Sequence, residues 1–293
     1  IIFQMQKVNA KKTIFKKQSQ KKPGLEYKMI PVPVFINSSP GSNKLLGKKC
    51  IITGGDSGIG RAVAIAFAKE GADVAIIYLK QEEKDAEFTA SIIEDTYSKT
   101  CLLIPTDISK ENHCIKAIKK TVNQFKNVDV LVNNAGVHYE AKDFLKITNE
   151  HLIETFSVNI FSMFWITKAT LPFMKKGACI INTTSVTAYR GSTALVDYSA
   201  TKGAVVSFTR SLSSNLVDKG IRVNGVAPGP VWTPLIASSF SSEKISTFGT
   251  DCPMKRPAQP VEISPAYVFL ACEDASYITG QIIHVNGGEI VNG

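Results

Sequence analysis

The stretch Thr53-Gly54-Gly55-Asp56-Ser57-Gly58-Ile59-Gly60 lies between an apolar run at residues 50–52 and a segment of helical periodicity at residues 59–70. Glycines in a turn between a strand and a helix let the backbone approach a ligand closely. The N-terminus of the helix then offers free N–H groups and a positive dipole end to a pyrophosphate. Many tight turns contain glycine, but this strand–turn–helix context favours a nucleotide-binding turn.

Working outward, apolar runs alternate with amphipathic segments along the chain. Strands are predicted at residues 50–52, 74–79, 101–104, 128–132, 179–183, 221–226 and 281–285, and helices at 59–70, 82–97, 112–125, 149–174, 197–219 and 261–271. Continuous Val- and Ile-rich strands separated by helices are typical of a parallel sheet covered on both faces. The pattern predicts one α/β domain over residues 47–293, with a loop-rich insertion at residues 228–260 as a candidate lid over a substrate.

The net charge of +9 is concentrated at the N-terminus, where residues 1–49 hold eleven lysines and one acid, Glu26. The rest of the chain is close to neutral, whereas nucleic-acid binding needs lysines on the folded body, so no nucleic-acid partner is expected. Residues 1–46 are predicted to form a basic extension, partly disordered or packed on the body or on a partner subunit. Removal of residues 1–44 is expected to leave the active site intact.

The remaining composition excludes several classes of site. The six cysteines contain no C-x-x-C pair and are interpreted as buried hydrophobes of a protein in a reducing compartment, the cytoplasm. The four histidines lack metal-ligand spacing, so no metal is expected. No run of 18 apolar residues occurs, so no membrane span is expected.

A candidate proton-transfer device follows in the second half of the chain. Tyr198 and Lys202 are four residues apart and share one face of a predicted helix, thirteen residues after Ser185. A free tyrosine titrates near ~10, and a neighbouring ammonium favours the phenolate. We therefore expect Lys202 to lower the pKa of Tyr198 and to make it an acid or base usable near neutrality. Singly, each residue could equally be structural: Ser185 could end a strand, Tyr198 could be packed and Lys202 could lie on the surface.

Together these residues resemble the short-chain dehydrogenase/reductase family. The matching pieces occur in the family's order and cover about residues 47–290: Thr53-Gly54-x-x-x-Gly58-x-Gly60, Asp107, Asn133-Asn134-Ala135-Gly136, Asn159, Ser185, Tyr198-x-x-x-Lys202 and Pro228-Gly229. Within the family, the chain is similar to a bacterial group of general-stress and aldehyde-reductase-like proteins with a basic N-terminal extension.

The resemblance implies a Rossmann-type parallel sheet of about seven strands, an NAD or NADP cofactor, and a homotetramer or dimer. It implies that Tyr198 is the general acid or base, that Lys202 lowers its pKa and holds the nicotinamide ribose, and that Ser185 binds the substrate oxygen. Asn159 would hold a water that links Lys202 to solvent, and Asp107 would contact the adenine. The expected cofactor-binding residues are Gly54, Ser57, Gly58, Ile59, Gly60, Asp107, Asn133, Ala135, Gly136, Tyr198, Lys202, Pro228, Gly229, Val231 and Thr233.

Cofactor choice is expected to be decided after the second strand, which ends Ile77-Tyr78-Leu79-Lys80-Gln81. A carboxylate there would bind the ribose 2′-hydroxyl, and an arginine or lysine would bind a 2′-phosphate. No acid and no arginine is present, and Lys80 could reach a phosphate or could be a solvated loop residue. The missing arginine favours NAD.

The candidate substrate walls are mostly apolar and aromatic: Val137, His138, Tyr139, Val186, Tyr189, Trp232, Leu235, Phe240 and Met254. Arg190 is the one cation seen near them, so we expect a neutral carbonyl compound or alcohol such as an aldehyde, a small ketone or a sugar. Two other classes stay open: a nucleotide-binding protein without turnover, used for regulation or assembly, and a sugar-nucleotide epimerase that shares the Tyr-x-x-x-Lys device. A methyltransferase of similar architecture would not need Tyr198 and Lys202.

Overall fold

The computed structural model describes residues 14–290. Within this range one sheet of seven strands has the order β3-β2-β1-β4-β5-β6-β7, and all neighbours are parallel. The strands are β1 (Lys49–Thr53), β2 (Asp73–Tyr78), β3 (Cys101–Pro105), β4 (Val130–Asn133), β5 (Cys179–Thr183), β6 (Arg222–Pro228) and β7 (Ile282–Val285). The predicted Rossmann-type doubly wound parallel sheet is confirmed.

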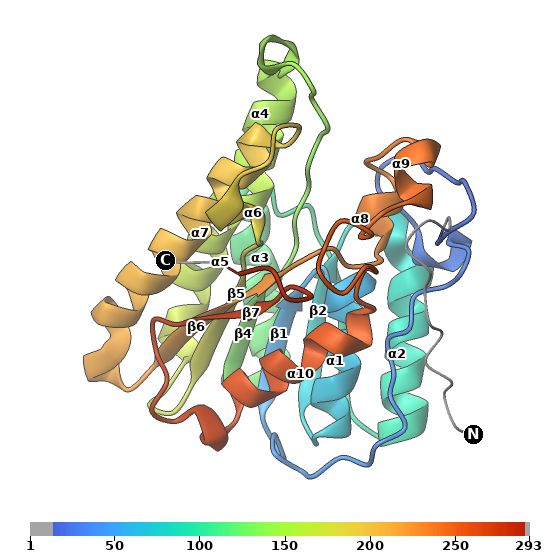
Figure 1. Cartoon of the computed structure of the whole chain (residues 1–293). Coiled ribbons are helices and arrows are strands. Elements are labelled where there is room, and N and C mark those ends of the chain that lie inside the picture. Colours follow the sequence, from blue (N-terminus) through green and yellow to red (C-terminus); the bar gives the residue numbers. More distant parts are fainter. Residues whose placement is uncertain (1–13, 291–293) are drawn as a thin grey trace.

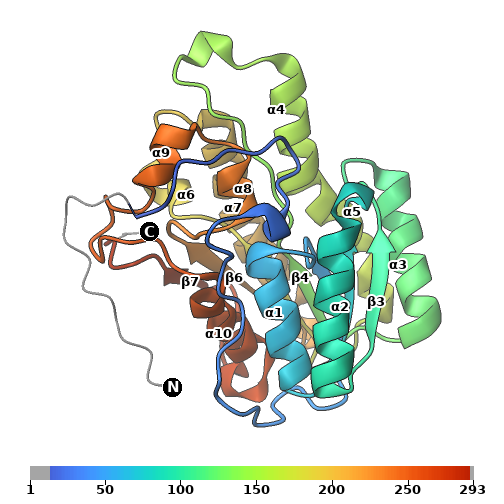
Figure 2. The ribbon, with the colours of Figure 1, turned by 90° about the vertical axis from the view of Figure 1, so that its right-hand side faces the viewer.

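Helices cover both faces of this sheet (Figures 1 and 2). One face carries α1 (Gly58–Lys69), α2 (Glu83–Tyr97) and α10 (Pro260–Ala271), and the other carries α3 (Glu111–Phe125), α4 (Asn149–Phe156), α5 (Ser162–Thr170) and α7 (Val196–Leu216). Successive strand residues point to opposite faces, so Ile52 packs in the core beneath α1 while Ile51 packs in the core beneath α3. Both faces are therefore apolar, as the continuous Val/Ile runs predict.

The strand order reverses at β1, which pairs with β2 on one side and β4 on the other. In open α/β sheets, ligands bind outside the carboxyl ends of the strands at such a switch point. The turn at residues 53–60 and the segment after β4 both lie at this edge.

The predicted helix over residues 149–174 contains an interruption. A π turn at Ser157–Phe161 separates α4 from α5, and a 3₁₀ turn at Leu171–Phe173 closes the unit. Single π turns inside helices often occur at functional sites, and this one carries Asn159.

The predicted lid region, residues 228–260, contains two short helices, α8 (Pro234–Ala237) and α9 (Ser242–Ser246). The short helix α6 (Thr187–Arg190) follows β5 and leads toward α7. Among the helices within residues 14–290, none is long and apolar enough to cross a membrane.

The described part of the N-terminal extension packs on the body of the same chain (Figure 2). The Phe15 ring stacks on Trp232 of the lid at 3.8 Å between centroids, and Trp232 Nε1 donates to the Pro31 carbonyl at 2.9 Å. Phe15, Met29 and Trp232 belong to one buried cluster with α8 and α9. The extension was expected to be partly disordered or to pack on the body or on a partner subunit, and residues 14–46 pack on the body. Residues 1–13 lie outside the described range.

Candidate active site

The glycine-rich turn after β1 is closed by contacts that leave no room for side chains. A Cβ at Gly60 would lie 1.8 Å from the Gly54 carbonyl oxygen. Gly58 has φ +52°, and a Cβ there would lie 3.1 Å from Thr233 Cγ2 in the lid. Glycine is therefore required at both positions, and the turn lies against the lid residue that the resemblance assigns to the cofactor.

A buried charged network from the N-terminal segment supports this turn. The Gly58 N–H donates to Glu26 Oε2 at 2.6 Å, and the Arg61 guanidinium binds both Glu26 and, at 3.1 Å, Asp85. All three charged side chains are buried. Burial raises the pKa of Glu26 to about 7, although Arg61 opposes the rise. The sequence offered no signal for this network because Glu26 lies 32 residues before Gly58.

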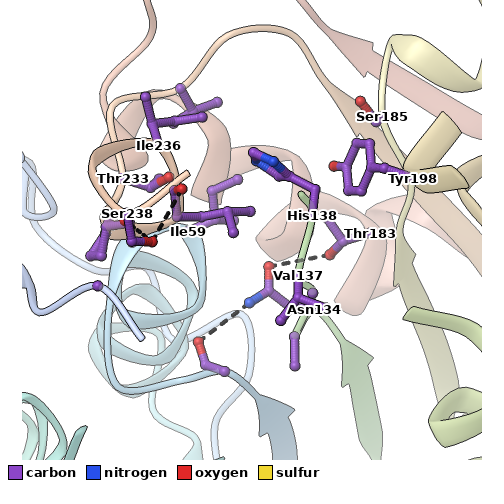
Figure 3. Close-up of a pocket in the computed structure, with 18 of the residues that line it drawn as sticks. Ile59, Asn134, Val137, His138, Thr183, Ser185, Tyr198, Thr233, Ile236 and Ser238 are labelled. Carbon is purple, nitrogen blue, oxygen red and sulfur yellow. Dashed lines mark hydrogen bonds between the residues drawn. The ribbon is translucent and has the colours of Figure 1, made fainter. Parts of the chain in front are cut away.

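The segment after β4 is tied to the same turn. Thr53 Oγ1 accepts hydrogen bonds from the N–H groups of Asn134 and Ala135 at 2.9 and 3.0 Å. The Asn134 amide donates to the Thr53 carbonyl at 3.1 Å, and its oxygen accepts from Thr183 (Figure 3). Ends of β1, β4 and β5 are thus held together at the switch point.

Tyr198, Ser185 and Lys202 are brought together from the start of α7 and the end of β5, with the Ser185 and Tyr198 side chains on one side of the pocket (Figure 3). Lys202 Nζ lies 5.5 Å from the centroid of the Tyr198 ring. It donates to the Thr183 carbonyl at 2.8 Å and is buried.

The electrostatics of this group differ from the prediction. Burial raises the pKa of Tyr198 to about 12, and a hydrogen bond with Ser185 offsets only part of the rise. Burial also lowers the pKa of Lys202 to about 8. The expected lowering of the Tyr198 pKa by Lys202 is not seen in this structure, because desolvation of the phenolate is the largest effect on that pKa and raises it.

Asn159 is held by the π turn against the segment after β4. Its Oδ1 accepts from the Val137 N–H at 2.8 Å, and its Nδ2 donates to the Val137 carbonyl at 2.8 Å and to Thr201 Oγ1 at 3.1 Å. A Cβ at Gly136 would lie 3.3 Å from Asn159 Oδ1 and 3.6 Å from Lys202 Nζ, so these two polar atoms flank Gly136. Asn159 thereby fixes the strand-end backbone beside Lys202.

A cavity of about 980 Å³ runs along this edge of the sheet. The predicted cofactor residues that line it are Gly54, Ser57, Gly58, Ile59, Asp107, Ala135, Gly136, Tyr198, Lys202, Pro228, Gly229, Val231 and Thr233, and Ser185 lines it too. Gly60, Asn133 and Asn159 are not among the lining residues. Gly60 closes the turn, while Asn133 Nδ2 donates to Asn182 Oδ1 at 2.9 Å inside the protein.

One end of the cavity lies at the tip of β2 and carries carboxyl groups. Lys80 there forms an exposed pair with Glu83 at 2.8 Å. Asp56 and Glu82 both line the cavity, and the sequence analysis had assigned neither of them. Burial raises the pKa of Glu82 to about 8, with Asp56 adding to the rise, and burial raises the pKa of Asp56 to about 6.

The other end is the candidate substrate pocket. The His138 ring contacts Tyr198 at 5.1 Å and Phe240 at 5.3 Å between centroids, and it lies between Tyr198 and Ile236 (Figure 3). Burial lowers the pKa of His138 to about 3, so its ring is neutral near pH 7.

The structure brings some expected walls together and not others. Val137, His138, Tyr139, Val186, Leu235 and Phe240 line the cavity, as does Arg190, which pairs with Glu289 at 2.9 Å. Trp232, Tyr189 and Met254 are not among the lining residues. Trp232 is used to anchor the N-terminal segment, the Tyr189 ring packs on His284, and Met254 is 66% exposed. A wall that the sequence analysis missed is Lys22.

Comparisons with known proteins identify the family of this chain. A family model described as "Enoyl-(Acyl carrier protein) reductase" matches residues 54–289. The chain is 55% identical to "Uncharacterized oxidoreductase YhxC" of Bacillus subtilis, over 97% of this chain and 98% of the relative. It is 52% identical to "NADPH-dependent aldehyde reductase 1, chloroplastic" of Arabidopsis thaliana, over 94% of this chain and 98% of the relative.

Solved structures have the same fold. A short-chain dehydrogenase/reductase from Brucella melitensis, titled glucose/ribitol dehydrogenase, superposes with a TM-score of 0.77 at 33% identity, covering 85% of this chain and 99% of that chain. L-Sorbose reductase from Gluconobacter frateurii, complexed with NADPH and L-sorbose, superposes with a TM-score of 0.76 at 27% identity, covering 83% and 97%.

Proposed function

Because this chain belongs to the short-chain dehydrogenase/reductase family and is an NAD(P)-dependent oxidoreductase, we propose that it interconverts a small neutral carbonyl compound and its alcohol, with Tyr198 transferring the proton. The alternative of a nucleotide-binding protein without turnover is thereby set aside. The observation that carries the proposal is the convergence of Ser185, Tyr198 and Lys202 at one end of a cavity whose other end is the glycine-rich turn.

Several features of the cavity fit a bound nicotinamide dinucleotide. The turn at residues 53–60 can accept backbone contact because Cβ atoms are excluded from it. Lys202, Ser57, Ile59 and Thr233 line one continuous space and would hold the cofactor together with the other lining residues named above. When bound, the cofactor supplies or accepts the hydride.

The chain's own contribution is one proton and a polar site for oxygen. A substrate carbonyl oxygen would accept hydrogen bonds from Ser185 and Tyr198, which stabilise the negative charge that develops on it. Burial keeps the Tyr198 phenol protonated near pH 7, so it is a proton donor in the reductive direction. In the oxidative direction the phenolate would be the base.

The substrate end supports an uncharged molecule. Arg190 is paired with Glu289, and Lys244 is paired with Glu140 at 2.8 Å, so these two cations have carboxylate partners. Relatives are named as an aldehyde reductase, a glucose/ribitol dehydrogenase and a sorbose reductase. An aldehyde, a small ketone or a sugar is the substrate class that we propose.

For the cofactor we propose a preference for NAD over NADP. The end of the cavity at the tip of β2 is lined by Asp56 and Glu82, whose carboxyl groups can hydrogen-bond ribose hydroxyls. Lys80, the cation beside this end that could bind a 2′-phosphate, is paired with Glu83. Two of the similar proteins are named with NADPH, so the preference is a property to measure in this chain. A lower KM for NADPH than for NADH would contradict it.

The central test removes one hydroxyl. Tyr198→Phe should lower kcat of carbonyl reduction by roughly 10²- to 10⁴-fold, the usual contribution of a general acid, while the protein still binds the cofactor. Turnover is followed by NADH or NADPH consumption across an aldehyde, ketone and sugar panel, and affinity by cofactor fluorescence. Tyr189→Phe is the matched control because Tyr189 does not line the cavity. Near-normal turnover of Tyr198→Phe would refute the assignment.

We also propose a homotetramer or dimer in the cytoplasm. Exposed apolar side chains cluster on α4, the π turn and α5, namely Leu152, Ile153, Phe161 and Phe164. All six cysteines are free thiols, which supports a reducing compartment. A light-scattering mass equal to that of the monomer, 31.8 kDa, would contradict the proposed oligomer. Recovery of the protein from a non-cytosolic cell fraction would contradict the proposed compartment.

A further inference from the structure

Lys22 reaches the substrate end of the cavity from the N-terminal segment, more than 100 residues away in sequence from its partners. Its Nζ donates to the His138 carbonyl and, at 3.0 Å, to Ser239 Oγ of the lid. The ammonium also lies 4.1 Å from the centroid of the Tyr139 ring. The side chain is thus a wall of the pocket held between the lid and the segment after β4.

One residue, His138, connects Lys22 to the proposed reacting centre at Tyr198. His138, whose carbonyl accepts from Lys22, packs its ring on Tyr198 at 5.1 Å between centroids. Lys22 and Tyr198 both line the same cavity. A substrate whose carbonyl lies at Tyr198 would therefore share its cavity with the Lys22 ammonium.

The charge around Lys22 is balanced by nearby carboxylates. Burial lowers the pKa of Lys22 to about 8, while Glu154 and Asp197 partly oppose that fall. Glu154 also accepts from the Tyr139 hydroxyl at 2.7 Å, and Asp197 accepts from the Tyr198 N–H at 2.8 Å. An ammonium so compensated is a poor site for an anion but remains a hydrogen-bond donor with three N–H groups, two of which point at His138 and Ser239.

We propose that Lys22 is a specificity-determining residue, whose ammonium donates a hydrogen bond to a hydroxyl of the substrate and so selects hydroxylated carbonyl compounds over apolar ones. This inference rests on the proposed carbonyl reduction. It assigns part of the substrate pocket to the N-terminal segment, which lies outside the residues that the family model matches.

The physical reason for selectivity is the cost of an unsatisfied donor. An apolar aldehyde would displace water from a partly buried ammonium and leave an N–H without an acceptor, whereas a substrate hydroxyl replaces that water. Sites built to bind a hydroxyl discriminate strongly against analogues that lack it. Hydrogen bonds to charged groups are the stronger kind, so the preference should be large enough to measure.

The test compares two three-carbon aldehydes, glyceraldehyde and propanal, with wild type, Lys22→Met and Lys21→Met. Lys21 is the exposed neighbour that does not line the cavity and serves as the matched control. We expect Lys22→Met to lower the ratio of kcat/KM for glyceraldehyde to that for propanal by about tenfold or more. Lys21→Met should leave the ratio unchanged.

Other outcomes are equally informative. An unchanged ratio in Lys22→Met, or an equal loss for both aldehydes, overturns the inference, since the second result marks a structural role. Lys22→Gln keeps N–H donors and should therefore retain part of the preference for glyceraldehyde over propanal. A preference no higher than that of Lys22→Met also overturns the inference. Wild-type reduction of propanal but not glyceraldehyde overturns the inference and leaves the proposed function standing. Wild-type turnover of neither aldehyde, nor of the wider carbonyl panel, overturns the proposed function itself.

Discussion

At the scale of single residues, burial decides the protonation of the proposed catalytic group. Lys202 is buried and Tyr198 is partly buried, and the pKa of each is shifted in favour of the neutral form, that of the tyrosine upward to about 12 and that of the lysine downward to about 8. An i, i+4 spacing predicts that the two side chains are neighbours, and they are. It does not predict the solvent around them, and desolvation is the larger effect here.

A pH dependence follows from these values. Lys202 is charged below pH about 8 and loses its proton as the pH rises through that value, whereas Tyr198 stays protonated to much higher pH. If the ammonium helps to hold the cofactor, kcat/KM for reduction should be highest below pH 8 and fall above it. The measurement is a profile from pH 6 to 10 with propanal.

Lys22 also titrates at about 8, so the same profile is recorded for Lys22→Met, which should still show the fall. Lys202→Arg, which keeps a cation above pH 8, should move the fall to higher pH. A wild-type profile that is flat to pH 10 would contradict the role of the Lys202 charge.

At the scale of elements, the first turn of α1 packs closely against the glycine-rich turn that precedes it. Gly60 stands in the first turn of α1, directly against the Gly54 carbonyl. Gly60→Ala should displace the turn and weaken cofactor binding by at least tenfold, as measured by fluorescence titration. Gly203→Ala is the matched control, because Gly203 lies in α7 with no atom within 4 Å of a Cβ.

That control should be neutral, or should stabilise the protein by up to about 1 kcal/mol, since alanine favours a helix over glycine. Equal cofactor affinity of Gly60→Ala and wild type would show that the turn does not hold the cofactor.

The π turn is the second element with a functional position. Periodicity predicts one helix over residues 149–174 and does not reveal the π turn at Ser157–Phe161 inside it. Its consequence is local: the Asn159 amide meets both the N–H and the carbonyl of Val137. The water-binding role that the resemblance implies for Asn159 stays a prediction.

At the scale of the whole molecule, the N-terminal segment is part of the architecture of the cleft. Its Glu26 binds Arg61 and the Gly58 N–H, its Phe15 and Met29 pack with the lid, and its Lys22 lines the cavity. The expectation that residues 1–44 can be removed without harm to the active site conflicts with these contacts. We now expect that truncation to destabilise the turn, the lid and cofactor binding together.

A single substitution measures the main contact. Glu26→Ala should lower the free energy of unfolding by about 3 kcal/mol, because it leaves the buried Arg61 guanidinium and the Gly58 N–H without one of their acceptors. Urea denaturation gives the value. Glu243→Ala is the control: Glu243 also pairs with the N-terminal segment, through Lys17, but that pair is exposed to solvent and should contribute little to stability. A loss of stability in Glu26→Ala as small as that of the control would contradict the support that Glu26 gives to Arg61 and Gly58.

The sequence by itself determined the sheet, its two apolar faces and the ordered positions of the glycine turn, Ser185, Tyr198 and Lys202, because these depend on periodicity and on contacts within short spans of chain. The tertiary structure alone decided the protonation of Tyr198, the wall provided by Lys22 and the support provided by Glu26. Each of these depends on solvent exclusion or on partners tens to hundreds of residues away, and neither quantity is encoded in local spacing.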